Sequence, residues 1–186
     1  MRKLIKFNEH GHLLISITNL GLTGSEEIER LEAGGYKIGG EADSILLDKT
    51  PLGYETKHCL EKYTETQIVL IPNKEIPPIE THHSIVNRCI EEYASSFNYR
   101  IPPAGIVPYL CVKDLFEELS SLDISDILIF HEPISANNLY PRRLSVSRQY
   151  GDFCFNDQRP VYVGTIPAYN DLQLRYRGAT AFLAPD

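Results

Sequence analysis

Six histidines are the first residues that could do chemistry, and four of them come in two close pairs. His10 and His12 are separated by one glycine, so on an extended segment both imidazoles point to the same side. His82 and His83 form the second pair. Imidazoles are common metal ligands, but the sequence has neither an H-E-x-x-H motif nor a C-x-x-C motif. We therefore predict no metal site and no cofactor.

Isolated residues are the candidates for acid-base or nucleophilic catalysis. His131 and Glu132 end an apolar segment, and loops at the ends of strands often carry active sites. A thiol nucleophile needs a histidine nearby, and His83 and Cys89 lie on one predicted helix. We expect Cys89 to face the core, where burial makes a thiol inert. His131, Glu132, His83 and Cys89 are thus the residues on which the alternative function, a small hydrolase or metal-dependent nuclease, would rest.

A second nuclease-like pattern joins Asp48 to Glu55 and Lys57. Two carboxylates and a lysine in this order resemble the metal-binding element of one nuclease superfamily, in which the E-x-K segment lies on an apolar strand. Here the segment is polar, Tyr54 to His58. We interpret the match as chance.

Arginine and tyrosine are concentrated late in the chain. Residues 139–178 hold six arginines, no lysine and three aspartates, so this stretch has a net charge of +3 and the rest of the chain −10. Arginine and tyrosine are enriched where protein interfaces gain most energy. The predicted binding residues are Tyr140, Arg142, Arg143, Arg148, Tyr150, Arg159, Tyr162, Arg175, Tyr176 and Arg177. Their alternative role is structural, as tyrosines packed on arginine stems across a half-exposed sheet.

The overall charge argues for a protein partner. Arginines and tyrosines can also contact phosphates and stack on bases. However, the net charge of −7 would repel nucleic acid at long range, so we predict no direct nucleic-acid binding.

Acidic helices provide a second possible contact surface. Such residues can be solvated helix faces, or they can meet a basic protein surface, for instance a groove that normally holds nucleic acid. The acidic residues are Glu26, Glu27, Glu29 and Glu32, with Glu91, Glu92, Glu117 and Glu118 on later helices.

The predicted helices and strands that must position these residues follow one another along the chain without a regular order. The pattern predicts an N-terminal hairpin, a first helix capped by Ser25 and stopped at Gly34, and a helix from Thr81 with an apolar stripe. The C-terminal third is predicted to be mostly β, so we expect a single α+β domain without regular βαβ units. The other expected helices cover 41–47 and 112–122, and the strands cover 2–7, 13–18, 66–72, 126–131, 144–148, 152–155, 161–165 and 180–183.

The amino-acid composition limits the class of protein and its expected cellular location. With 42% hydrophobic and 23% charged residues the chain is an ordinary globular protein, and its apolar runs are too short to cross a bilayer. Four widely spaced cysteines are typical of reduced thiols. We therefore expect a cytoplasmic protein; the sequence leaves the oligomeric state open.

Two segments carry a resemblance. Residues 25–38, an acidic helix followed by Gly-Gly-Tyr-Lys-Ile, and residues 177–185, Arg-Gly-Ala-Thr-Ala-Phe-Leu-Ala-Pro, resemble small uncharacterised proteins of bacterial genomes and mobile elements. The resemblance implies no activity. Together with the charge pattern it leads us to expect a macromolecule-binding accessory protein, such as an inhibitor or an anti-defence factor of a bacterial or phage element.

Overall fold

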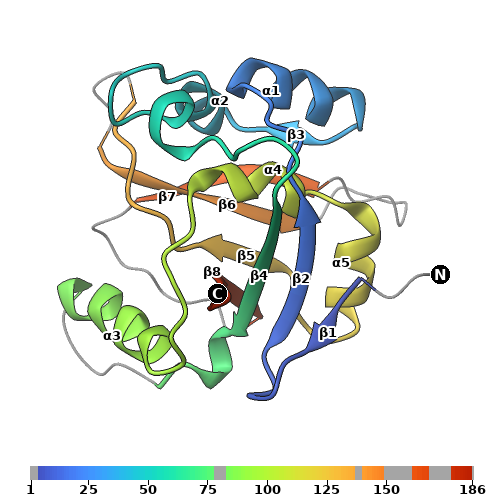
Figure 1. Ribbon diagram of the computed structural model, residues 1–186, viewed down its shortest axis with the longest axis vertical. Coiled ribbons are helices and arrows are strands. Elements are labelled where there is room, and N and C mark those ends of the chain that lie inside the picture. Colours follow the sequence, from blue (N-terminus) through green and yellow to red (C-terminus); the bar gives the residue numbers. More distant parts are fainter. Residues whose placement is uncertain (1–3, 78–82, 137–139, 149–160, 168–176, 186) are drawn as a thin grey trace, which may run out of the picture.

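The architecture is α+β, as the sequence predicts, and is built on one mixed sheet of eight strands (Figure 1). The computed structural model describes residues 4–77, 83–136, 140–148, 161–167 and 177–185. The strand order is β1-β2-β4-β8-β5-β6-β7-β3. Neighbouring strands are antiparallel except for the β5/β8 and β3/β7 pairs, which are parallel.

The strands agree with most of the expected segments. β1 and β2 form the predicted N-terminal hairpin, with Phe7 opposite Leu13. The expected strand at 152–155 lies outside the described residues. The strands are β1 (Lys6–Phe7), β2 (Leu13–Thr18), β3 (Lys37–Ile38), β4 (Glu65–Pro72), β5 (Asp126–Ile129), β6 (Arg142–Arg148), β7 (Val161–Pro167) and β8 (Gly178–Leu183).

The helices lie in two groups. Figure 1 shows α1 and α2 at one end of the molecule and α3 apart from them. The helices are α1 (Gly24–Ala33), α2 (Gly40–Leu46), α3 (His83–Ser95), α4 (Val107–Leu110) and α5 (Lys113–Ser120), with a π-helical turn at Tyr54–His58 and 3₁₀ turns at Asn73–Glu75 and Ala104–Ile106. Within the described residues, no helix combines the length and apolar character needed to cross a bilayer.

The sheet separates two apolar clusters because successive residues of a strand point to opposite faces. On β4, Ile68 and Leu70 belong to the larger cluster, which also holds the buried residues of α1, α2, α4 and α5. Val69 and Ile71 point the other way, into the cluster that α3 covers with Ile90 and its neighbours. In the described part of the apolar stripe predicted for α3, Ile90, Tyr93 and Phe97 therefore pack at this cluster.

Helix α1 begins two residues earlier than the sequence suggests. Its N-cap is Thr23, not Ser25. The Thr23 side chain accepts from the Glu26 backbone N–H, and the Glu26 carboxylate accepts from the Thr23 backbone N–H at 2.8 Å. This reciprocal pair is a capping box, which satisfies two N–H groups that a helix end would leave free. Gly34 ends the helix as predicted.

Candidate binding surface

The charges of α1 divide between an inner and an outer side. Glu27 is 1% exposed and faces the interior. Arg30, the single cation of α1, reaches inward to it: the Nη2 of Arg30 lies 2.7 Å from Glu27 Oε2, and Nε donates to the same oxygen at 2.8 Å. A buried carboxylate needs such a partner because desolvation of an unpaired charge is costly. The expectation that Glu27 is a surface residue was therefore wrong.

Further contacts hold Arg30 toward the interior. Its Nη2 donates to the Pro108 carbonyl at 3.0 Å, and its guanidinium lies over the Tyr109 ring, 5.3 Å from the centroid. These contacts connect α1 to α4. They also mean that the positive charge of Arg30 is used against Glu27 and does not offset carboxylates on the outer side of the helix.

Glu26, Glu29 and Glu32 form what we call the outer acidic face of α1. All three are exposed. Their spacing of three residues places them on one side of the helix, where like charges repel one another. This arrangement costs helix stability, and within α1 no cation is left to relieve it.

The described part of the predicted arginine and tyrosine surface is divided. Arg142 reaches α2, where its Nη2 lies 2.9 Å from Glu41 Oε1. Thr165 Oγ1 donates to the other oxygen of Glu41 at 2.7 Å, so that β6, β7 and α2 are connected by one polar network. The charge of Arg142 is therefore largely neutralised within the fold.

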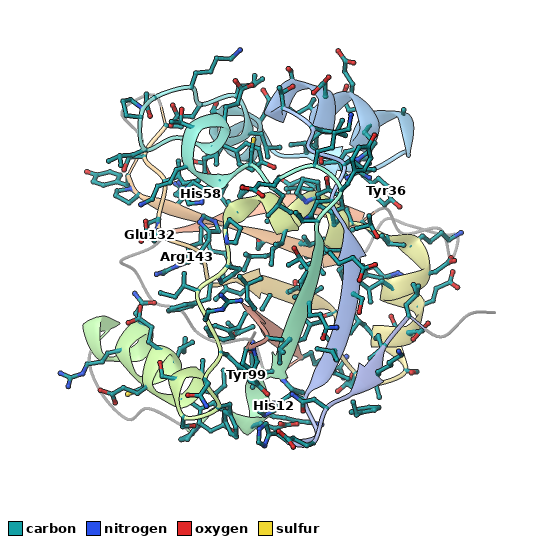
Figure 2. The ribbon with its side chains drawn as sticks, viewed as in Figure 1. His12, Tyr36, His58, Tyr99, Glu132 and Arg143 are labelled. Carbon is teal, nitrogen blue, oxygen red and sulfur yellow. The ribbon has the colours of Figure 1, made fainter. Side chains whose placement is uncertain are left out.

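Arg143 corrects the sequence prediction most clearly. It is 5% exposed, so it is not a surface residue. Its Nε donates to the His131 carbonyl at 2.8 Å, Nη1 donates to Asn87 Oδ1 at 3.2 Å, and the guanidinium lies 4.3 Å from the centroid of the Phe130 ring. The five donors of a guanidinium and its flat apolar faces allow this kind of burial. Figure 2 shows Arg143 near His58 and Glu132.

The other described members of that surface lie at different places. Arg148 donates to Ser120 Oγ at 3.2 Å, and Arg177 lies 3.4 Å from Asp123 Oδ1, both near the end of α5. Tyr140 is 83% exposed just before β6, at the opposite end of that strand from Arg148. Tyr162 is half-buried on β7. Tyr150, Arg159, Arg175 and Tyr176 lie outside the described residues.

Both ring nitrogens of the candidate base His131 are already used by the backbone. Nε2 lies 2.7 Å from the Leu144 nitrogen and accepts its N–H. Nδ1 therefore carries the ring proton and donates to the Glu132 carbonyl at 2.5 Å. Burial lowers the pKa of His131 to about 3. In this arrangement His131 connects β5 to β6 and offers no free nitrogen to a substrate.

The groups around His131 do not complete a catalytic arrangement. The ring of His58 lies 5.7 Å away between centroids, and its Nδ1 accepts the Ala104 N–H at 3.2 Å. Glu132 pairs with Lys57 at the surface, and the hydrogen bond from Lys57 lowers the pKa of that carboxyl. The structure does not bring the candidate bases together with an activated nucleophile among the described side chains.

The cysteines have the character of structural thiols. Burial raises the pKa of Cys59 to about 11, and it raises the pKa of the fully buried Cys111 further. Cys89 is half-buried on α3. His83 begins α3, but its side chain lies outside the described part of the structure, as do His82 and Cys154.

Two of the patterns with metal-site potential lie in the described part of the structure, the His10/His12 pair and the Glu55/Lys57 segment. His10 and His12 do lie near each other, with ring centroids 6.2 Å apart, but His12 is buried against Tyr99, whose hydroxyl lies 2.8 Å from Nδ1 (Figure 2). Among the described residues, no group of three or more histidines, cysteines or carboxylates is arranged to hold a metal ion. Glu55 and Lys57 lie on a π-helical turn and not on a strand.

No family model, curated protein or solved structure matches the chain.

Two features of the surface were missed from the sequence. The sequence did not predict that Arg30 points inward, because on a helix Arg30 can pair equally well with Glu26 or with Glu27. The exposed Tyr63, in the polar segment 61–66, was missed as well. A lone aromatic among charged residues is the signal that could have found it.

Proposed function

We propose that this protein acts by binding a basic protein partner through the outer acidic face of α1. The observation that carries the proposal is the division of charge on that helix. Arg30 is held against Glu27, while Glu26, Glu29 and Glu32 remain exposed together. Of the two contact surfaces suggested by the sequence, this one is continuous within a single helix.

The energetics support a binding role for these carboxylates. Glu26 stabilises α1 as its capping residue, but like charges three residues apart weaken a helix by about 0.2–0.5 kcal/mol per pair, so the repulsion along the outer face lowers the stability of the helix. A complementary basic surface would relieve the repulsion and would also speed association by electrostatic attraction. A role as an inhibitor or anti-defence factor of a mobile element is compatible with this surface, since a groove that binds nucleic acid is itself basic.

The hydrolase alternative receives less support. Of its candidate residues, His131 has both ring nitrogens bound to the backbone, and the His83 side chain lies outside the described residues. A binding role needs no such group and no cofactor.

Charge reversal on α1 tests the proposal. Glu29→Lys/Glu32→Lys changes the outer face but leaves Glu26, which caps the helix, in place. The control is Glu91→Lys/Glu117→Lys, which reverses two exposed carboxylates on α3 and α5 and alters the net charge equally. Each protein is immobilised and exposed to a lysate of its source organism, and the retained proteins are identified by mass spectrometry.

We expect the wild-type protein and the control to retain the same basic protein, and the α1 variant to lose it. With the purified partner, the α1 variant should bind at least tenfold more weakly, and wild-type binding should weaken as salt rises. If the α1 variant and the wild type retain the same proteins equally, the proposal is wrong.

A further inference from the structure

Tyr63 is a large aromatic side chain that the fold leaves in solvent. It is 74% exposed, between the π-helical turn and β4. Leu20, on the neighbouring segment after β2, is 41% exposed. Single exposed apolar residues are common, but an exposed tyrosine and an exposed leucine on two hydrogen-bonded segments provide two side chains that can fill an apolar pocket.

The backbone that carries Tyr63 is held in place on both sides. The Tyr63 N–H donates to the Asn19 carbonyl at 2.8 Å, and the Asn19 N–H donates to the Thr64 carbonyl at 2.9 Å. Gly21 packs so closely on Lys62 that a Cβ at Gly21 would lie 2.8 Å from the Lys62 Cα. The ring of Tyr63 therefore projects from a fixed position, which reduces the entropy lost when a partner binds it.

This exposed pair lies next to the N-terminal end of α1. Hydrogen bonds from Thr23 lower the pKa of Glu26, and the nearby charge of Lys62 lowers it further. Lys62 also covers part of the Tyr63 ring, with Nζ 4.9 Å from the centroid. Glu61 and Glu65 are exposed on either side of Tyr63 in sequence. Two exposed carboxylates thus flank Tyr63 in sequence, and the charge of Lys62 links this segment to Glu26 at the start of the outer acidic face of α1.

We infer that Tyr63, with Leu20, is the apolar anchor of the contact surface and inserts into a pocket that the partner surrounds with lysine or arginine side chains. Charge complementarity selects this occupant: Lys62 is one cation, and the exposed carboxylates of Glu61, Glu65 and α1 outnumber it, so a pocket rimmed by carboxylates would be repelled. The inference rests on the proposed function and adds the residue that provides the central contact. Interfaces of this kind place an aromatic anchor inside a ring of polar contacts.

The backbone of Tyr63 allows a test that separates binding from folding. Tyr63 has φ 62°, in the left-handed region that glycine adopts without strain. Tyr63→Gly should therefore leave the melting temperature unchanged or raise it while removing the anchor. Asn98→Gly is the matched control, because Asn98 is exposed with φ 60° at the end of α3. The probe is the purified basic partner that the α1 experiment identifies, and affinity is measured by calorimetry.

Tyr63→Gly should weaken binding at least tenfold without a lower melting temperature, whereas Asn98→Gly should bind like the wild type. If Glu29→Lys/Glu32→Lys loses the partner but Tyr63→Gly binds within twofold of the wild type, the anchor is refuted and the proposed function stands. If no partner depends on α1, both fail. A lower melting temperature for Tyr63→Gly would assign Tyr63 a structural role and overturn the inference.

Discussion

Helix α1 and strand β6 both carry charges that a sequence alone would place at the surface, and the fold treats the two regions differently. On α1 the cation turns inward to Glu27, and the remaining carboxylates stay outside. On β6 two of the three arginines turn to partners within the fold, Arg143 to the His131 carbonyl and Arg142 to Glu41. In both regions an arginine makes several inward contacts, because a guanidinium can satisfy several acceptors and lie over a ring at once. Of these two regions, α1 is the one that keeps a row of exposed carboxylates.

The largest expected effect is a loss of stability at low pH, caused by His131, which is hydrogen-bonded to β6. The folded pKa of His131 is about 3, below its ordinary value of 6.5. Between those values the unfolded chain takes up a proton that the folded protein does not, so stability present above pH 6.5 is lost as the pH falls. Each pH unit below 6.5 lowers the free energy of unfolding by about 1.4 kcal/mol, so the loss amounts to about 3 kcal/mol at pH 4. His58 and His12, whose pKa values are lowered chiefly by burial, act in the same direction.

Urea unfolding of the wild type and of His131→Gln at pH 7 and at pH 4 measures this loss. The neutral amide should reduce the pH dependence. An equal loss in both proteins would show that His131 is not the group responsible.

The next effect concerns the inner side of α1. Arg30→Ala leaves the Glu27 carboxylate buried without its partner and should lower the free energy of unfolding by about 3 kcal/mol. The double variant Glu27→Leu/Arg30→Met, which removes both charges, should recover most of that loss. Chemical denaturation of the three proteins checks the order, and a double variant as unstable as Arg30→Ala would contradict it.

A smaller loss is expected inside the β6 region. Arg143→Gln removes a buried guanidinium from the His131 carbonyl and from the Phe130 ring, which should cost about 2 kcal/mol. Arg148→Gln, which loses one surface contact with Ser120, should cost less than about 0.5 kcal/mol. Partner binding by stable Arg143→Gln protein should equal that of the wild type. Weaker binding would return the late arginines to the contact surface.

The smallest expected effect is a gain in stability, in contrast to the losses predicted above. Glu29→Lys replaces two repulsive pairs on the outer acidic face with attractive ones, so the free energy of unfolding should rise by about 0.5 kcal/mol. Binding of the basic partner should weaken in the same variant. A variant that lost stability would show that Glu29 has a structural contact, and its binding defect could not then be assigned to charge.

Local pattern was sufficient to predict most of the longer elements, but not the short β3 and α4. The hairpin, the stripe of α3 and the stop of α1 at Gly34 follow from apolar periodicity and glycine, which act within a few residues. The cap at Thr23 was missed because Ser25 has an equally good side chain, and only the path of the chain before the helix selects between them.

The sequence by itself determined the composition of the two charged regions, the α+β class and the amphipathic faces. Only the tertiary structure decided which charges lie inside. Arg30 finds the Pro108 carbonyl 78 positions away, Arg143 finds His131, and Leu144 occupies the nitrogen on which a catalytic His131 would depend. Burial of a charge or an imidazole depends on acceptors and donors that the fold brings from distant segments, and no local pattern records where those will be.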